Sequence, residues 1–109
     1  MNVKLLRKIQ KQILAKPESF TMWYPEKCVA GWACRLSGIP MNRCYAESSC
    51  VAKATELLDI TKPQADLLFY QYFKTDEPIF ADAWGAPSKK RAELMAERID
   101  VFIETKGTK

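Results

Sequence analysis

The stretch CVAGWACRLSG, residues 28–38, decides the fold class. It brackets a glycine and a tryptophan between two cysteines, and among its first eight residues only Arg35 is polar. On a helical wheel, one side carries Val29, Trp32, Ala33 and Leu36, and much of the other side carries only small residues, Ala30, Gly31 and Cys34. A helix that is apolar almost all round is buried among other elements. The stretch therefore predicts a central, buried helix.

Two glycines in this stretch have separate meanings. Gly31 stands in mid-helix, where glycine costs about 1 kcal/mol relative to alanine, which predicts a close approach by another helix. Gly38 is followed by Ile39 and Pro40, a pattern typical of a left-handed helix cap. We expect the helix to end there.

Four further helices are expected around this one. The first covers residues 1–16 and ends before Pro17. The next begins at Ser48 or Ser49 and ends near residues 59–60, and a capping box at residues 61–64 starts another. The last begins at Ser88, with Gly107 just past its end. Together with two aromatic-containing loops (17–27 and 74–87), this pattern predicts an all-α bundle of about five helices, in a single domain over residues 1–109.

Composition excludes several kinds of chemistry. The 109 residues include no histidine, which removes the commonest general base, the Ser-His and Cys-His nucleophile pairs and histidine-containing zinc sites. No apolar run is long enough to span a membrane, and charges interrupt the apolar positions near residue 1, unlike a secretory signal. We expect a soluble, cytoplasmic protein without a cofactor.

Four cysteines are weak candidates for a metal site: Cys28, Cys34, Cys44 and Cys50. Zinc sites typically use pairs spaced by two to four residues. If Cys28 and Cys34 share one helix, their side chains diverge by about 120° and converge only if the helix begins after Cys28. A reactive thiolate would need a lowered pKa, for which a first-turn position at Cys28 is the available cause. The simpler interpretation is that these cysteines pack as small apolar side chains.

Basic residues gather at two places in the sequence. The first helix carries four on about a third of its circumference, and the last helix starts with three, where the helix dipole disfavours positive charge: Lys4, Arg7, Lys8 and Lys11, then Lys89, Lys90 and Arg91. One interpretation is a phosphate-binding stripe for nucleic acid. The other is a solvated helix face.

A second apolar line predicts a contact surface. Leu94 and Val101 lie seven residues apart on the last helix, away from its main apolar stripe. Either the loop aromatics cover them or another chain does. Together with Trp23 and Trp84 of the loops, they are the residues expected to bind a protein partner or a second copy of the chain.

Five segments carry a resemblance to a known family: residues 5–23, CVAGWA (28–33), A-x-ELL (54–58), QADLLFY (64–70) and AERIDVFIET (96–105). This arrangement resembles a family of small uncharacterised all-α proteins of bacteria and phages that share a Cys-aliphatic-Ala-Gly-Trp/His-Ala core. The resemblance implies the fold and no mechanism. Its members carry a further cysteine before the core, where this chain has Pro25-Glu26-Lys27, and an aliphatic residue where this chain has Cys34.

The sequence thus predicts no enzyme. The leading hypothesis is a small protein-interaction module, self-associating and related to phages or mobile elements. The two alternatives are a nucleic-acid-binding protein that uses the basic face of the first helix, and a small-ligand or thiol/metal-binding protein.

Overall fold

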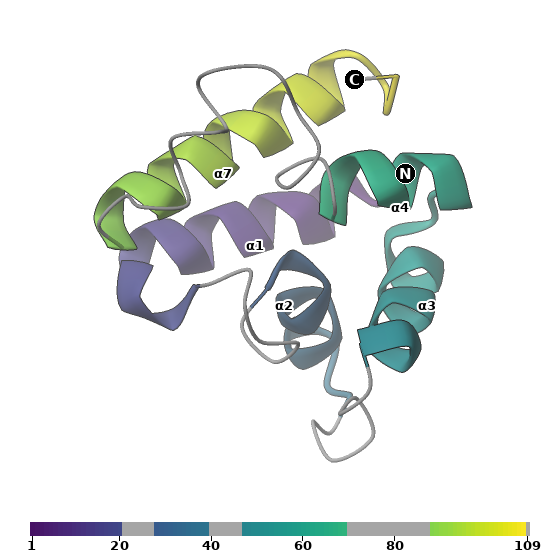
Figure 1. Cartoon of the computed structure of the whole chain (residues 1–109), viewed down its shortest axis with the longest axis horizontal. Coiled ribbons are helices and arrows are strands. Elements are labelled where there is room, and N and C mark those ends of the chain that lie inside the picture. Colours follow the sequence, from purple (N-terminus) through teal and green to yellow (C-terminus); the bar gives the residue numbers. More distant parts are fainter. Residues whose placement is uncertain (21–27, 40–46, 70–87, 109) are drawn as a thin grey trace.

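The helices of the structure, a computed structural model, follow the sequence pattern closely. It describes residues 1–20, 28–39, 47–69 and 88–108. Those ranges contain five α-helices, one 3-10 turn and no strand. In chain order they are α1 (Val3–Ala15), η1 (Pro17–Ser19), α2 (Val29–Leu36), α3 (Glu47–Leu58), α4 (Lys62–Phe69) and α7 (Ser88–Glu104) (Figure 1). The all-α prediction is confirmed.

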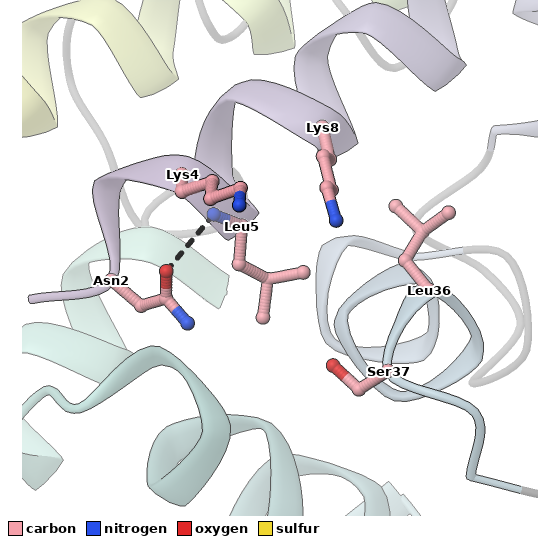
Figure 2. A pocket seen from close by; sticks show the side chains of 6 residues that line it. All are labelled: Asn2, Lys4, Leu5, Lys8, Leu36 and Ser37. Carbon is pink, nitrogen blue, oxygen red and sulfur yellow. Dashed lines mark hydrogen bonds between the residues drawn. The ribbon is translucent and has the colours of Figure 1, made fainter.

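Helix α1 lies at the centre of the arrangement. It packs beside α7 on one side and α2 on the other, while α2 also packs against α3 (Figure 1). A cavity remains where the beginning of α1 faces the end of α2 (Figure 2). None of the described helices is both long and apolar enough to cross a membrane.

The core confirms that α2 is a buried helix. Every residue from Val29 to Cys34 is buried, Gly31 included. Trp32 makes two polar contacts: its Nε1 donates to the Ser19 carbonyl at 3.1 Å, and the Arg35 guanidinium lies over its ring, 4.0 Å from the centroid. Apolar side chains from all the other α-helices complete the core, including Leu6, Ile9, Ile13, Ala54, Leu58, Leu68, Met95, Ile99 and Phe102.

Helix α2 ends as predicted. Gly38 has φ +80°, the left-handed conformation that glycine adopts without strain. Its N–H donates to the Arg35 carbonyl at 3.1 Å, and that of Ile39 donates to the Cys34 carbonyl at 3.0 Å. These two bonds form a Schellman motif, which satisfies carbonyls that the helix end leaves open.

Two other helix ends use residues that the sequence did not single out for this conformation. Asp59 (φ +53°) ends α3, and the Ile60 N–H donates to the Thr55 carbonyl at 3.2 Å. Lys106 (φ +54°) ends α7 one residue before Gly107, whose N–H donates to the Phe102 carbonyl at 2.8 Å. Left-handed backbone is uncommon outside glycine, so only the end positions were predictable.

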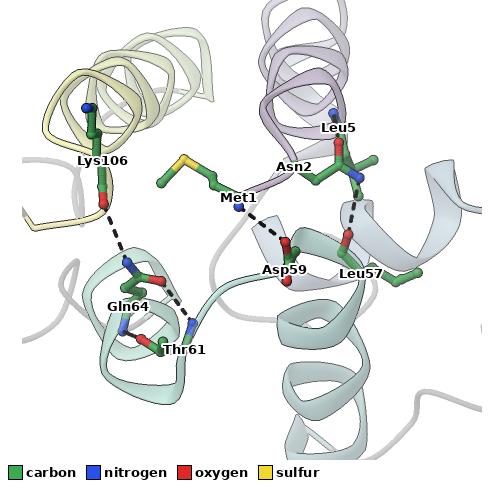
Figure 3. Close-up of polar contacts among 8 residues, drawn as sticks. All are labelled: Met1, Asn2, Leu5, Leu57, Asp59, Thr61, Gln64 and Lys106. Atoms are coloured by element: carbon green, nitrogen blue, oxygen red, sulfur yellow. Dashed lines mark hydrogen bonds and ion pairs between the residues drawn. The ribbon is translucent and has the colours of Figure 1, made fainter.

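The start of α4 is a capping box, as predicted (Figure 3). The Gln64 N–H donates to Thr61 Oγ1 at 3.3 Å, and the Thr61 N–H donates to Gln64 Oε1 at 2.9 Å. Gln64 Nε2 also donates to the Lys106 carbonyl at 3.4 Å, which ties α4 to the end of α7. In the same view, Asn2 caps α1 by accepting from the Leu5 N–H at 3.0 Å and donates to the Leu57 carbonyl at 3.2 Å.

One predicted boundary needs correction. Helix α3 begins at Glu47, one or two residues before the predicted start at Ser48 or Ser49. The loop after α1 begins with the η1 turn, and Phe20 at its end is buried (1% exposed). The rest of that loop and the loop before α7 lie outside the described residues.

Candidate functional site

A polar seam joins α1 to α7. Gln10 is buried, and its Nε2 donates to the Ala96 carbonyl at 2.7 Å and to Asp100 Oδ1 at 2.9 Å. Arg7 donates to Gln10 Oε1 at 2.7 Å and forms an ion pair with Asp100. The hydrogen bond from Gln10, followed by that from Arg7, lowers the pKa of Asp100. In the sequence, Gln10 can be recognised as a polar residue on the otherwise apolar side of α1.

This seam predicts a small acid dependence of stability. The pKa of Asp100 is lower in the folded state than in the unfolded state. Asp100 therefore contributes to the free energy of unfolding above its unfolded-state pKa, and this contribution is lost as pH falls through its folded-state pKa. We expect Asp100→Asn to lower the free energy of unfolding at neutral pH by less than about 1 kcal/mol, since the pair is half-exposed. The measurement is urea unfolding at a series of pH values, from neutral pH to below the pKa of Asp100. The free energy of unfolding of Asp100→Asn should change less with pH than that of the parent. Glu97→Gln, a control at an exposed position, should show the same pH dependence as the parent.

The structure does not assemble the predicted basic residues into one stripe. Arg7 is held by Asp100, and Arg91 donates to Ser88 Oγ at 3.2 Å. Helix α7 runs antiparallel to α1, so residues 89–91 lie beside the C-terminal end of α1, far from Lys4 (Figure 1). Lys4, Lys8, Lys11, Lys89 and Lys90 are exposed. The basic residues therefore form separate groups.

The second apolar line is partly covered by the chain itself. Leu94 is 3% exposed and Val101 is half-buried. Residues of the same chain therefore bury Leu94, and no second chain is needed to cover it. Trp23 and Trp84 lie outside the described residues. Leu94 is thus unsuited to a partner contact in this conformation.

Cys28 lies at the N-terminus of α2, directly before the first helical residue. The helix begins at Val29, and Cys28 is the N-cap in extended backbone. Its Sγ accepts a hydrogen bond from the Gly31 N–H at 3.5 Å. Cys28 is half-buried, so its sulfur has limited access to solvent.

The same boundary brings three cysteines together. Because Cys28 precedes the first helical turn, the divergence expected from a shared helix does not apply. The thiols of Cys28 and Cys34 both hydrogen-bond to the Cys50 thiol at the beginning of α3. Cys34 Sγ also donates to the Cys50 carbonyl at 3.8 Å. Cys34 and Cys50 are buried, and Cys44 lies outside the described residues.

These contacts make the thiols chemically unequal. The hydrogen bond from the Cys50 thiol lowers the pKa of Cys28, and the backbone N–H groups of Ala30 and Gly31 add to this effect against an opposing effect of burial. The pKa of Cys50 is raised, first by the hydrogen bond with Cys28, then by that with Cys34 and by burial. Of these two thiols, Cys28 therefore ionises more readily.

The thiols meet without forming a metal centre. In the described part of the chain, no group of three or more histidine, cysteine, aspartate or glutamate side chains is arranged to hold a metal ion. The described cysteines are all in the thiol form. The arrangement instead suits chemistry between two sulfur atoms, with one partly accessible and one buried.

Comparison with known proteins adds no relative from which to argue. No protein-family model, curated protein or solved structure matches the chain. The resemblance to small proteins of bacteria and phages stays a prediction from sequence motifs. Any function must be argued from the residues themselves.

Proposed function

We propose that this protein is a redox-responsive thiol protein, in which Cys28 and Cys50 interconvert between two thiols and one disulfide. The observation that carries the proposal is that the Cys28 sulfur, at the N-terminus of α2, contacts the Cys50 thiol at the start of α3. Two segments far apart in sequence would be joined covalently by oxidation. This develops the thiol alternative of the sequence analysis.

The proposed chemistry begins at Cys28 with a hydroperoxide as the oxidant. The Cys28 thiolate attacks one oxygen of hydrogen peroxide, the O–O bond breaks, and the departing hydroxide takes a proton to leave as water. Cys28 is then a sulfenic acid. The Cys50 sulfur attacks the Cys28 sulfur, the S–O bond breaks, and the Cys50 proton leaves with the hydroxyl as a second water. Two electrons have passed from the thiols to the peroxide.

Burial divides the two roles. Cys28 is half-buried, has the lowered pKa and accepts the Gly31 N–H, which favours its thiolate as the attacking group. Cys50 is 1% exposed and holds its proton, so it is protected from direct oxidation but lies beside the sulfenic acid once that forms. A small dithiol reductant would restore both thiols by thiol–disulfide exchange.

The other proposals have less support in the described residues. Of the two residues proposed for a partner surface on α7, Leu94 and Val101, Leu94 is buried in the core of its own chain. The nucleic-acid stripe is divided, with Arg7 engaged by Asp100. The contact between Cys28 and Cys50 is the arrangement that best matches a specific reaction.

The test is a count of thiols after mild oxidation of the whole chain. The reduced protein is treated with hydrogen peroxide, quenched, denatured and alkylated, and its intact mass is measured. We expect a product in which two of the four cysteines resist alkylation until a dithiol reductant is added. A product with all four cysteines alkylated, or with oxygen added and no pair formed, would argue against the proposal.

A further inference from the structure

The cavity between α1 and α2 is a second place with its own chemistry (Figure 2). It has a volume of about 250 Å³ and is broadly open to solvent. The first turns of α1 and the last residues of α2 provide its walls: Asn2, Lys4, Leu5, Lys8, Leu36 and Ser37. The lining thus includes two ammonium groups, one hydroxyl and two leucine side chains, and none of the lining residues is acidic.

The positive charge of this cavity has no counter-ion among the described residues. Lys4 and Lys8 are four residues apart on α1, an arrangement in which like charges destabilise a helix. Helix α1 contains no acidic residue, and the ion pair that it does form, between Arg7 and Asp100, lies on the side facing α7. In the described ranges, neither cavity lysine forms an ion pair. A bound anion would relieve this repulsion.

Helix α2 allows an anion here because its end is already capped. The carbonyls of Cys34 and Arg35 accept hydrogen bonds within the Schellman motif, which reduces the negative potential at that helix end. Ser37 adds a hydroxyl donor beside the two lysines. Asn2 is occupied by its bonds to Leu5 and Leu57, so it fixes the wall and leaves ligand binding to the other groups.

Size and lining select the class of anion. With a volume of about 250 Å³, the cavity has room for a phosphate group and a few further atoms. Lysine ammonium groups bind phosphate as point charges with charge-assisted hydrogen bonds. Leu5 and Leu36 offer an apolar surface to the organic part of a phosphate ester.

We propose that this cavity binds the phosphate group of a phosphate ester through Lys4, Lys8 and Ser37. The phosphate could belong to a free small molecule or to a nucleic-acid strand, since the binding chemistry is shared. The simpler competing role for the lysines is to offset the carbonyl dipoles at the end of α2. The two roles differ in whether added phosphate binds saturably.

The experiment titrates the whole chain with three probes: inorganic phosphate, a nucleoside monophosphate and a single-stranded oligonucleotide, with backbone amide shifts as the readout. We expect saturable shifts at Lys4, Lys8 and Ser37 with each probe. The double variant Lys4→Gln/Lys8→Gln should bind at least about tenfold more weakly, because two charge-assisted hydrogen bonds are lost. Lys11→Gln, an exposed lysine of the same helix outside the cavity, should bind like the parent.

The three probes separate the sources of the phosphate. Tighter binding of the monophosphate than of inorganic phosphate would favour a free ester, and much tighter binding of the oligonucleotide would favour a strand, provided that the double variant weakens either one. The absence of saturable shifts in the parent would overturn the proposal. So would equal weakening by Lys11→Gln, which would indicate a diffuse basic surface. Because the decisive shifts are measured in the parent, the result does not depend on the stability of the variants.

Discussion

Replacing Phe20 with alanine is expected to lower the free energy of unfolding by about 3–5 kcal/mol, the cost of removing a buried aromatic ring and leaving a cavity. Phe20 is 1% exposed and follows the η1 turn, whose Ser19 carbonyl accepts the Trp32 indole N–H. A domain of this size is stable by roughly 5–15 kcal/mol, so the loss is a large part of the total.

Urea unfolding of the reduced protein measures this effect. Leu14→Ala is the matched control, because Leu14 is 47% exposed on the neighbouring helix α1 and should change stability by about 0.5 kcal/mol or less. If the two variants lost similar free energy, the placement of the Phe20 side chain in the core would be wrong.

Cys28→Ser is expected to abolish the reaction with peroxide that leads to a disulfide. Serine is a favourable N-cap residue, so the variant keeps the cap of α2 and loses only the sulfur nucleophile. We expect the rate of thiol loss at low peroxide to fall at least about tenfold, because the remaining described cysteines are buried. The measurement is the time course of alkylatable thiols under matched conditions.

Two further cysteine variants distinguish the roles in this reaction. Cys50→Ala should still react with peroxide but stop at the Cys28 sulfenic acid, which dimedone traps as a stable adduct. Cys34→Ala should still form the disulfide. Fast disulfide formation in Cys28→Ser, or no dimedone adduct in a folded Cys50→Ala protein, would contradict the assignment of the two roles.

Local signals allowed much of the fold to be predicted. The ends of α2 and α7 follow from Gly38 and Gly107, and the start of α4 follows from Thr61 and Gln64, because in each case nearby residues satisfy the helix end. The left-handed conformations of Asp59 and Lys106 were not predictable in this way. Left-handed backbone is uncommon outside glycine, and although aspartate adopts it more often than most residues, no local pattern at either position requires it.

The candidate sites depended on contacts that span the sequence. Cys28 and Cys34 can contact the same neighbour only because α2 begins one residue after Cys28, and the exact start of a helix is the feature that sequence predicts least well. The pairing of Arg7 with Asp100 requires the antiparallel packing of α1 against α7, which no local pattern specifies. The same packing places residues 89–91 far from Lys4, so the predicted basic residues do not form one stripe.

The most direct test of the central proposal is to map the disulfide in the peroxide-treated parent protein. Proteolysis without reduction, followed by mass spectrometry, identifies which peptides are linked. We predict one dominant linkage, between the peptides that contain Cys28 and Cys50, which disappears on reduction. A dominant linkage through Cys44, a mixture of all pairings, or the absence of any linked peptide would contradict it.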